Sequence, residues 1–273
     1  MIGAILGDAA GSVYEFDPIK TKRFNLFASR KGKTCHCTDD SLMTLAIAEA
    51  LMKSSDDFSD LAQNTIESMQ RIGRDHPHAG YGGMFSKWLY IEPLPYYSFG
   101  NGAAMRVSPV AYVAESLDEA LELSNIVTAV THDHPEGLKA ARAVTSCIYM
   151  ALHGEAKEVI LDHVRNNYYP LDKTLQQIRP DYEFDVTCMG SVPESIQCFA
   201  EAESLEDTIR NAISLGGDAD TMAAIAGSIA EAYYGAPDGW EEKAVQFLIQ
   251  SDEWYGLQPY LVDIYLDFRN KYM

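Results

Sequence analysis

The chain has 273 residues, and 40 acidic residues against 21 basic ones give it a formal net charge of −19. An acidic surface repels nucleic-acid phosphates, and no Lys/Arg cluster offsets this repulsion, so nucleic-acid binding is not expected. Hydrophobic residues make up 47% of the chain, which is ample for a core. No apolar run reaches the roughly 18–20 residues that span a bilayer, so no membrane segment is expected.

The first eleven residues and the cysteines bear on the cellular compartment. Residues 1–11 contain no basic region and include Asp8, so they are not expected to form a signal peptide. The five cysteines are odd in number and irregularly spaced, which indicates a reducing compartment rather than a disulfide framework. Cys35-His36-Cys37 lacks the usual spacing of zinc ligands. We therefore expect a cytoplasmic protein.

Hydrophobic residues recur with a helical period along most of the chain, and strand-like alternation is scarce. In chain order, the expected helices cover residues 41–52, 61–72, 116–130, 138–152, 205–215 and 221–234. Ser116 and Ser204 are expected to cap helices, and Gly154, Gly216 and Gly235 are expected to end them. The sequence predicts an all-α fold, a single compact orthogonal bundle of about ten to thirteen helices over residues 1–273.

Two long stretches rich in Gly, Pro and aromatic residues interrupt the helical pattern. One runs from His76 to Pro109 and the other from Tyr168 to Pro193. Loops of this length inside a compact domain are more often functional than not. We therefore expect them to shape the active site.

Residues 215–235 carry the strongest functional signal. The double glycine Gly216-Gly217 is followed by Asp218, Asp220 and Thr221, which lie at the start of an expected helix rich in small residues. Three hard oxygen ligands within four residues suit Mg²⁺ or Mn²⁺. Asp and Thr beside glycines are also ordinary helix caps, so this segment alone leaves both interpretations open.

A second acidic pair precedes the expected helix over 41–52. That helix has almost no polar face and belongs in the core, which places Thr38, Asp39 and Asp40 at or near the interior. Neighbouring buried carboxylates repel each other and lose hydration unless a counter-charge compensates them. A metal ion is the simplest counter-charge, because no Lys or Arg follows closely in the sequence. The alternative is that these residues only cap each helix and bind no metal. Four aspartates, with Glu15 as a fifth carboxylate, would balance two divalent ions.

Five ordered segments resemble the ADP-ribosylglycohydrolase family, which includes dinitrogenase-reductase-activating glycohydrolase and the ADP-ribosylhydrolases. The family has a Gly-Asp block ending in Glu, a Thr-Asp-Asp helix start, a Gly-Asn-Gly-x-x-Met-Arg loop, a Thr-His segment and a Gly-Gly-Asp-x-Asp-Thr segment. The matching segments are Gly3 to Glu15, Thr38 to Asp40, Gly100 to Arg106, Thr131-His132, and Gly216 to Thr221. Each is weak alone, but their shared order makes the resemblance specific.

The resemblance implies a hydrolase that cleaves the glycosidic bond between ADP-ribose and a modified side chain and so reverses ADP-ribosylation. It implies two divalent cations, Mg²⁺ or Mn²⁺, held by Thr38, Asp39, Asp40, Asp218, Asp220 and Thr221. Glu15, Asp39 and Asp220 are expected to be catalytic, with Asp220 bridging the metals and Glu15 acting as a ligand or general base near the leaving group. Substrate contacts are expected from Gly100, Asn101, Gly102, Met105, His132, Gly216 and Gly217. The partner is an ADP-ribosylated protein or a small ADP-ribose conjugate.

Two alternatives belong to other functional classes. An all-α phosphohydrolase would bind metal through a His132-Asp133 dyad, and it would leave Asp218 and Asp220 idle. A non-catalytic protein would bind ADP-ribose without cleaving it. Arginine, serine and other acceptors all fit the same expected metal site. Residues 236–273 add nothing to the family resemblance.

Overall fold

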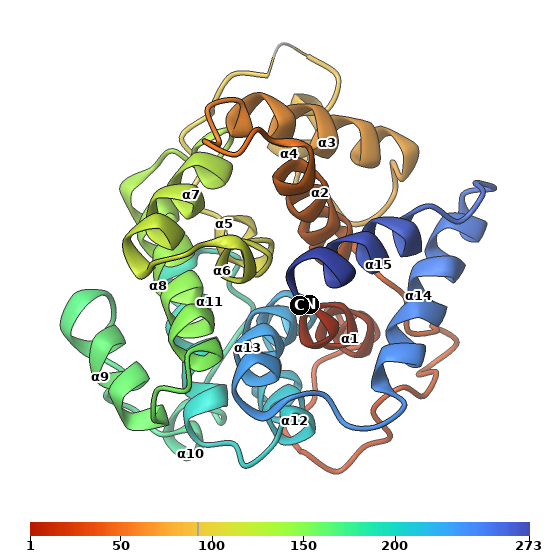
Figure 1. Ribbon diagram of the computed structural model, residues 1–273. Helices are drawn as coiled ribbons and strands as arrows, with labels where there is room; N and C mark the ends of the chain where they lie inside the picture. Colours follow the sequence, from red (N-terminus) through yellow and green to blue (C-terminus); the bar gives the residue numbers. More distant parts are fainter. Residues whose placement is uncertain (92) are drawn as a thin grey trace.

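The computed structural model describes residues 1–91 and 93–273, which form fifteen α-helices and no β-strand (Figure 1). The helices are α1 (Ile2–Gly11), α2 (Asp39–Lys53), α3 (Leu61–Asp75), α4 (Gly83–Trp88), α5 (Gly102–Met105), α6 (Val110–Val113), α7 (Leu117–Ala129), α8 (Pro135–Leu152), α9 (Lys157–Asn167), α10 (Leu175–Ile178), α11 (Cys188–Ala200), α12 (Leu205–Leu215), α13 (Ala219–Tyr234), α14 (Trp240–Trp254) and α15 (Leu261–Tyr272). The all-α prediction is confirmed. The helices beyond the expected number are accounted for by α5, α6 and α10, which have four residues each and are too short to show a hydrophobic period.

Helices α1 and α13 pack against each other (Figure 1). Glycines at their contact allow the two backbones to approach closely. A Cβ on Gly7 would lie 2.2 Å from the carbonyl oxygen of Ala223, and a Cβ on Gly3 would lie 2.1 Å from that of Gly227. A larger side chain would force these closely packed backbones apart. This contact fixes the first turn of α13 relative to α1.

The last two helices pack against α1 and α2. Asp252 of α14 accepts hydrogen bonds from the backbone N–H groups of Tyr260 and Leu261 at 2.7 and 2.9 Å, which fixes the turn into α15. Its other oxygen lies 3.0 Å from Nε2 of His76, at the end of α3, and both side chains are fully buried. Residues 236–273 therefore complete the core beside the loop that follows α3.

Capping side chains set several helix boundaries. The hydroxyl of Ser204 accepts a hydrogen bond from the backbone N–H of Asp207, and Gly216 adopts a φ of 69°, so α12 begins and ends where the sequence predicts. Helix α11 begins inside the stretch from Tyr168 to Pro193 that the sequence predicts to be a loop, because Thr187 caps it by accepting from the N–H of Gly190. Pro193, expected in a loop, consequently lies inside this helix.

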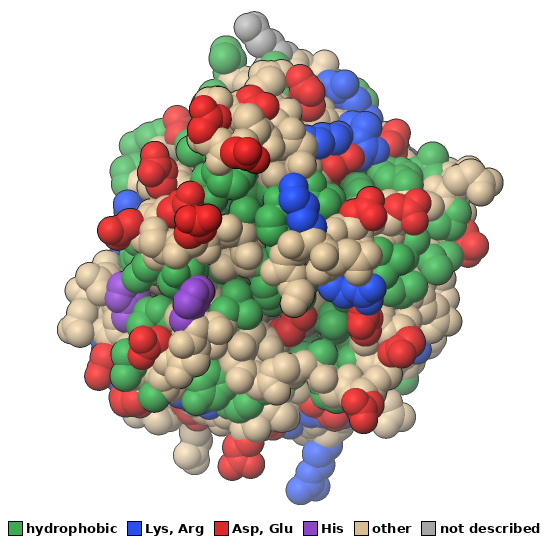
Figure 2. Space-filling model, in the orientation of Figure 1, with side chains coloured by type: hydrophobic (Ala, Val, Ile, Leu, Met, Phe, Trp, Pro, Cys, Tyr) green, Lys and Arg blue, Asp and Glu red, His purple; other side chains and the backbone are tan. Residues whose placement is uncertain are grey.

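The surface is acidic, as the composition predicts. Asp and Glu side chains are spread over the face shown in Figure 2. Within the described residues, none of the helices combines the length and the apolarity needed to cross a membrane.

Candidate active site

A cavity of about 550 Å³ lies where the starts of α2 and α13 meet the loops around α4 and α5. Its lining includes Glu15 and all six expected metal ligands, Thr38, Asp39, Asp40, Asp218, Asp220 and Thr221. Five of the expected substrate contacts also line it, namely Gly100, Asn101, Gly102, Met105 and His132. The volume is typical of a small-molecule site. The fold therefore gathers segments from both halves of the chain around one cavity.

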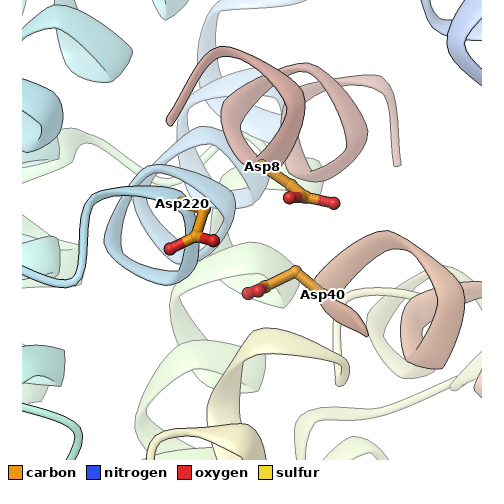
Figure 3. A group of neighbouring side chains, drawn as sticks. All are labelled: Asp8, Asp40 and Asp220. Carbon is orange, nitrogen blue, oxygen red and sulfur yellow. The ribbon is translucent and has the colours of Figure 1, made fainter. Parts of the chain in front are cut away.

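Three aspartates from three helices point toward one another beside this cavity (Figure 3). Asp8 of α1, Asp40 of α2 and Asp220 of α13 each place one carboxylate oxygen within 4.8 Å of the other two. All three are buried. Thr221 Oγ1 donates a hydrogen bond to Asp40 Oδ2 at 3.2 Å and so joins the starts of α2 and α13. The two acidic segments identified in the sequence thus meet in space.

Asp8 is a site residue that the sequence interpretation assigned no role. It is fully buried, and it accepts hydrogen bonds from the backbone N–H groups of Thr38 (2.9 Å) and Ser41 (3.0 Å) and from both of their hydroxyls. These contacts fix the start of α2, and with it Asp40. The available signal was the Gly7-Asp8 pair of the first family segment, which places a single carboxylate in the otherwise apolar and small-residue stretch from Met1 to Gly11.

A second group of carboxylates consists of Glu15, Asp218 and Asp220, which also place one oxygen each within 4.8 Å of one another. Asp220 belongs to both groups. Asp218 is held by Asn101, whose side-chain amide donates to Asp218 Oδ2 at 2.7 Å. Asp39 belongs to neither group, but it lines the cavity, and its backbone N–H donates to the carbonyl of Ala79 at 2.8 Å.

The cluster concentrates negative charge in a poorly hydrated place. Burial, followed by repulsion from neighbouring carboxylates, raises the pKa values of Asp39, Asp40 and Asp220 well above their usual range. Burial, followed by Asp218 and then Asp8, raises the pKa of Glu15 to about 7. Among the described residues, no ion pair involves these carboxylates. Within the described part of the chain, the cluster therefore has no ion-pair partner.

The residues of the cluster fit divalent cations. Asp40 Oδ1 is buried and has no hydrogen-bond partner among the described residues, so its desolvation is uncompensated. Every potential metal-ligand atom of the cluster is a carboxylate or hydroxyl oxygen, the ligand type that Mg²⁺ and Mn²⁺ prefer. The capping alternative explains only one helix start: Thr38 Oγ1 accepts from the N–H of Asp40 at 3.4 Å, whereas no capping hydrogen bond of the Asp218 side chain occurs in the described structure.

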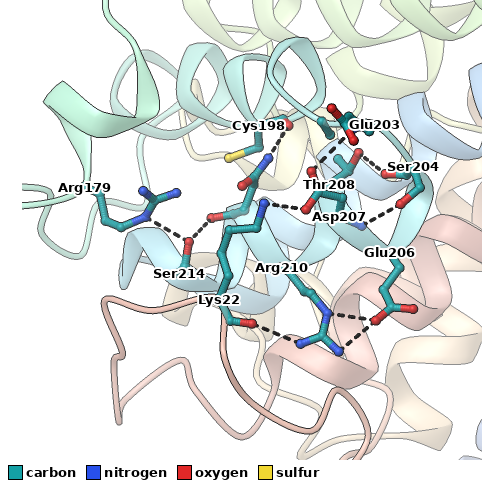
Figure 4. Close-up of polar contacts among 12 residues, drawn as sticks. Lys22, Arg179, Cys198, Glu203, Ser204, Glu206, Asp207, Thr208, Arg210 and Ser214 are labelled. Carbon is teal, nitrogen blue, oxygen red and sulfur yellow. Dashed lines mark hydrogen bonds and ion pairs between the residues drawn. The ribbon is translucent and has the colours of Figure 1, made fainter.

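Glu15 lies in the segment that links α1 to α2, and α12 anchors this segment (Figure 4). Arg210 of α12 donates to the carbonyl oxygens of Lys22 (3.1 Å) and Phe24 (2.6 Å). Lys22 also forms an ion pair with Asp207. These contacts hold the linking segment beside the cavity.

The predicted substrate loop packs closely on His132. A Cβ on Gly102 would lie 3.3 Å from Nε2 of His132, so glycine allows the ring to approach the loop backbone. Arg106, which follows the loop, is buried and donates to Oγ1 of Thr131 at 2.7 Å, and that oxygen lies 2.7 Å from Nδ1 of His132. Burial, followed by the charge of Arg106, lowers the pKa of His132 well below its usual value. His132 is therefore neutral at physiological pH.

Gly216 and Gly217 were expected to contact the substrate but are not among the described residues that line this cavity. Gly216 ends α12 and lines a smaller neighbouring cavity. A Cβ on Gly217 would lie 2.3 Å from Cε1 of Tyr182. The double glycine therefore lets the chain turn and pass close to Tyr182 before it reaches Asp218.

The proposed His132-Asp133 dyad is not assembled as a metal site. Asp133 accepts a hydrogen bond from the backbone N–H of Tyr97 at 2.7 Å. Neither residue belongs to a group of potential metal ligands found in the described part of the chain, whereas Asp218 and Asp220 do. This geometry gives no support to the phosphohydrolase alternative.

The protein is all-α, and buried carboxylates meet at the starts of two of its helices. A site of this kind is suited to divalent cations. The chain belongs to the ADP-ribosylglycohydrolase family, whose model matches residues 1–261. The resemblance noted in the sequence is thereby confirmed, and the match extends beyond residue 235 into the C-terminal helices.

Individual relatives agree with this assignment. The chain is 26% identical to the ADP-ribosylhydrolase ARH3 of Mus musculus, over 90% of this chain and 86% of the relative. It is 25% identical to the ADP-ribosyl-dinitrogen reductase glycohydrolase of Rhodospirillum rubrum, over 89% of this chain and 87% of the relative. A solved structure described as an ADP-ribosylglycohydrolase-related protein complex shares the fold, with a TM-score of 0.72, 24% identity, and coverage of 100% of this chain and 97% of its own. Both named relatives are hydrolases, as the sequence predicts for this chain.

Proposed function

We propose that this protein is a metal-dependent hydrolase that cleaves the glycosidic bond between ADP-ribose and an acceptor side chain, and so reverses ADP-ribosylation. The observation that carries the proposal is the convergence of Glu15, Asp40, Asp218 and Asp220 at one cavity in a chain of this family. The relatives named for hydrolysis of ADP-ribosyl compounds support the substrate class.

Two divalent cations, Mg²⁺ or Mn²⁺, would be held by Thr38, Asp39, Asp40, Asp218, Asp220 and Thr221. Asp220 lies beside Asp40 in one carboxylate group and beside Asp218 in the other, which supports a bridging role for it. When bound, such cations supply positive charge that orients ribose hydroxyls and makes water at the site more acidic. Asp8 holds Thr38 and Ser41 in place and is a positioning residue.

Glu15 is the proposed proton carrier. Its carboxyl group lines the cavity beside Asp218 and Asp220, where it can accept a proton from water and donate it to the leaving group. Hydrolysis breaks the bond between the anomeric carbon and the acceptor nitrogen or oxygen through an oxocarbenium-like state, and water supplies the new hydroxyl. Glu15 takes the proton from that water and returns it to the departing acceptor. The products are ADP-ribose and the unmodified side chain.

The loop from Gly100 to Met105 is proposed to bind the ADP-ribosyl group. The N–H groups of Gly100 and Asn101 already donate to Ser98 Oγ (3.2 Å) and to the carbonyl of Val186 (2.8 Å), so the backbone contact with a phosphate oxygen would come from the N–H of Gly102. Because Arg106 only donates, it leaves the Thr131 hydroxyl free to donate to Nδ1 of His132. His132 would then carry its proton on Nε2, which lies beside Gly102, and offer it to the substrate.

The organisation of the chain forms part of the proposal. One buried hydrophobic cluster includes residues of all fifteen described helices, which supports a single domain over residues 1–273. The five cysteines are buried and free, which supports residence in a reducing, cytoplasmic compartment.

A product assay tests the proposal. Peptides with arginine-linked and serine-linked ADP-ribose are incubated in parallel with the protein in Mg²⁺, in Mn²⁺ and in excess chelator, and free ADP-ribose is measured. We expect release from at least one peptide that stops in chelator and returns with added cation. Undiminished release in chelator, or no release from either peptide with either cation, contradicts the proposal.

A further inference from the structure

The cavity of the active site has a neighbour on the far side of Glu15. This second cavity has a volume of about 360 Å³, and Glu15 lines both of them. Its lining also includes Phe16, Lys20, Tyr182, Phe184 and Gly216. Gly216 lies two residues before Asp218, which lines the main cavity, so the two linings share Glu15 and are also close along the chain at this segment. We call this second cavity the outer shelf.

The outer shelf presents aromatic surface to solvent. The side chains of Phe16 and Phe184 are 71% and 47% exposed, and their ring centroids lie 5.8 Å apart. An exposed aromatic pair beside a polar site is a common feature of surfaces that bind a partner. The two rings come from segments far apart in sequence, the α1–α2 segment and the one preceding α11.

The outer shelf carries charges of both signs around its aromatic surface. Glu183 lines the shelf and is exposed, and it would repel a diphosphate. The Lys20 ammonium donates to the backbone carbonyl oxygens of Tyr182 and Leu215, and the ammonium of Lys33 lies 5.8 Å from the ring centroid of Phe16. The two aromatic rings, rather than one sign of charge, therefore determine what the shelf binds, and they suit an apolar group.

We propose that the outer shelf binds the polypeptide that carries the ADP-ribose, with an apolar side chain next to the modified residue resting on Phe16 and Phe184. This inference rests on the proposed function. The main cavity has the size of a ligand pocket, so a protein acceptor must continue outside it. Glu15, the proposed proton donor to the departing acceptor, lines both cavities. The natural substrates would then be modified polypeptides rather than small conjugates.

The test compares two substrates with the same linkage, a ten-residue ADP-ribosylated peptide with an apolar residue beside the modified side chain, and the corresponding ADP-ribosylated free amino acid. The double variant Phe16→Ala/Phe184→Ala is expected to raise KM for the peptide about tenfold, because the peptide loses the apolar surface on which its side chain rests. The value of kcat is expected to stay nearly unchanged. KM for the free amino acid conjugate is expected to stay at the wild-type value. Thermal melting checks that the variant is folded. We expect it to fold, because both replaced residues are exposed.

Met84→Ala is the matched control, because Met84 lines the main cavity and is 60% exposed, yet it is not among the residues lining the outer shelf. We expect Met84→Ala to change KM for the peptide and for the free amino acid conjugate by the same factor. An unchanged KM for the peptide in the double variant, an equal rise for both substrates, or discrimination by Met84→Ala instead would overturn the outer-shelf proposal. Each of these results leaves hydrolysis itself intact, whereas failure of the wild type on both substrates would count against the proposed function.

Discussion

Replacing Asp220 by asparagine is expected to have opposite effects on stability with and without metal. Asparagine keeps the shape and the Oδ1 that accepts from the N–H of Thr221 at 3.0 Å, but it removes the charge. Two unit charges within 4.8 Å of each other repel by at least about 3.5 kcal/mol at an effective dielectric constant of about 20. Proton uptake by the metal-free cluster relieves part of this repulsion, so we expect Asp220→Asn to stabilise the metal-free protein by about 2 kcal/mol.

The predicted result is a crossing of melting temperatures. In chelator, Asp220→Asn should melt about 4–8 °C above the wild type. A cation at one hundred times its Kd stabilises the wild type by about 2.7 kcal/mol per site, which corresponds to a rise of about 5–10 °C. The variant should lose most of this rise. Differential scanning fluorimetry in chelator and in Mn²⁺ measures both differences.

Asp252→Asn provides the matched control. Asp252 is also fully buried, but it already has His76 and two backbone N–H groups as partners. Its replacement should lower the melting temperature in both conditions and leave the rise caused by Mn²⁺ intact. If Asp220→Asn also lowers the melting temperature equally in chelator and in Mn²⁺, Asp220 has a structural role and the reasoning is refuted.

Three further predictions concern the surroundings of the cluster. Asp8→Ala frees Thr38 and Ser41 and should weaken Mn²⁺ binding about 10–100-fold in calorimetry; an unchanged Kd would remove Asp8 from the site. The pKa of Glu15 in the folded protein, about 7, lies above its ordinary value of 4.5, so the stability linked to its protonation is complete below about pH 4.5 and is lost as the pH rises through about 7. Melting temperatures in chelator should therefore fall over this range, more steeply in the wild type than in Glu15→Gln; equal slopes contradict the assignment. Gly217→Ala places a Cβ 2.3 Å from Tyr182, and it should destabilise the fold by about 1–3 kcal/mol in denaturant titration, whereas full stability would show that the two segments separate freely.

Local sequence signals account for the elements that were predicted correctly. Helix α12 was located to the residue because Ser204 and Gly216 mark its two ends chemically. Thr187 is an equally good cap, but the aromatic and polar composition before it concealed the start of α11. The one-turn helices depend on tertiary packing, and the chain carries no periodic signal for them.

The candidate site was predictable where several polar residues gather in one short segment. Thr38 to Asp40 and Asp218 to Thr221 both stood out in this way, and the fold places them on one cavity. Asp8 is a lone carboxylate whose partners lie about 30 residues away in sequence, so its contacts required the packing of α1 against α2. The outer shelf was invisible for the same reason, because Phe16 and Phe184 become neighbours only in the folded chain.

The central claim is that two acidic segments, distant in sequence, jointly hold divalent cations. Anomalous X-ray diffraction at the manganese absorption edge, from crystals grown with Mn²⁺, tests this claim most directly. We predict two manganese peaks within coordination distance of the carboxylate oxygens of Asp40, Asp218 and Asp220. An absence of peaks there at saturating Mn²⁺, or a peak at His132 and Asp133 instead, would contradict it.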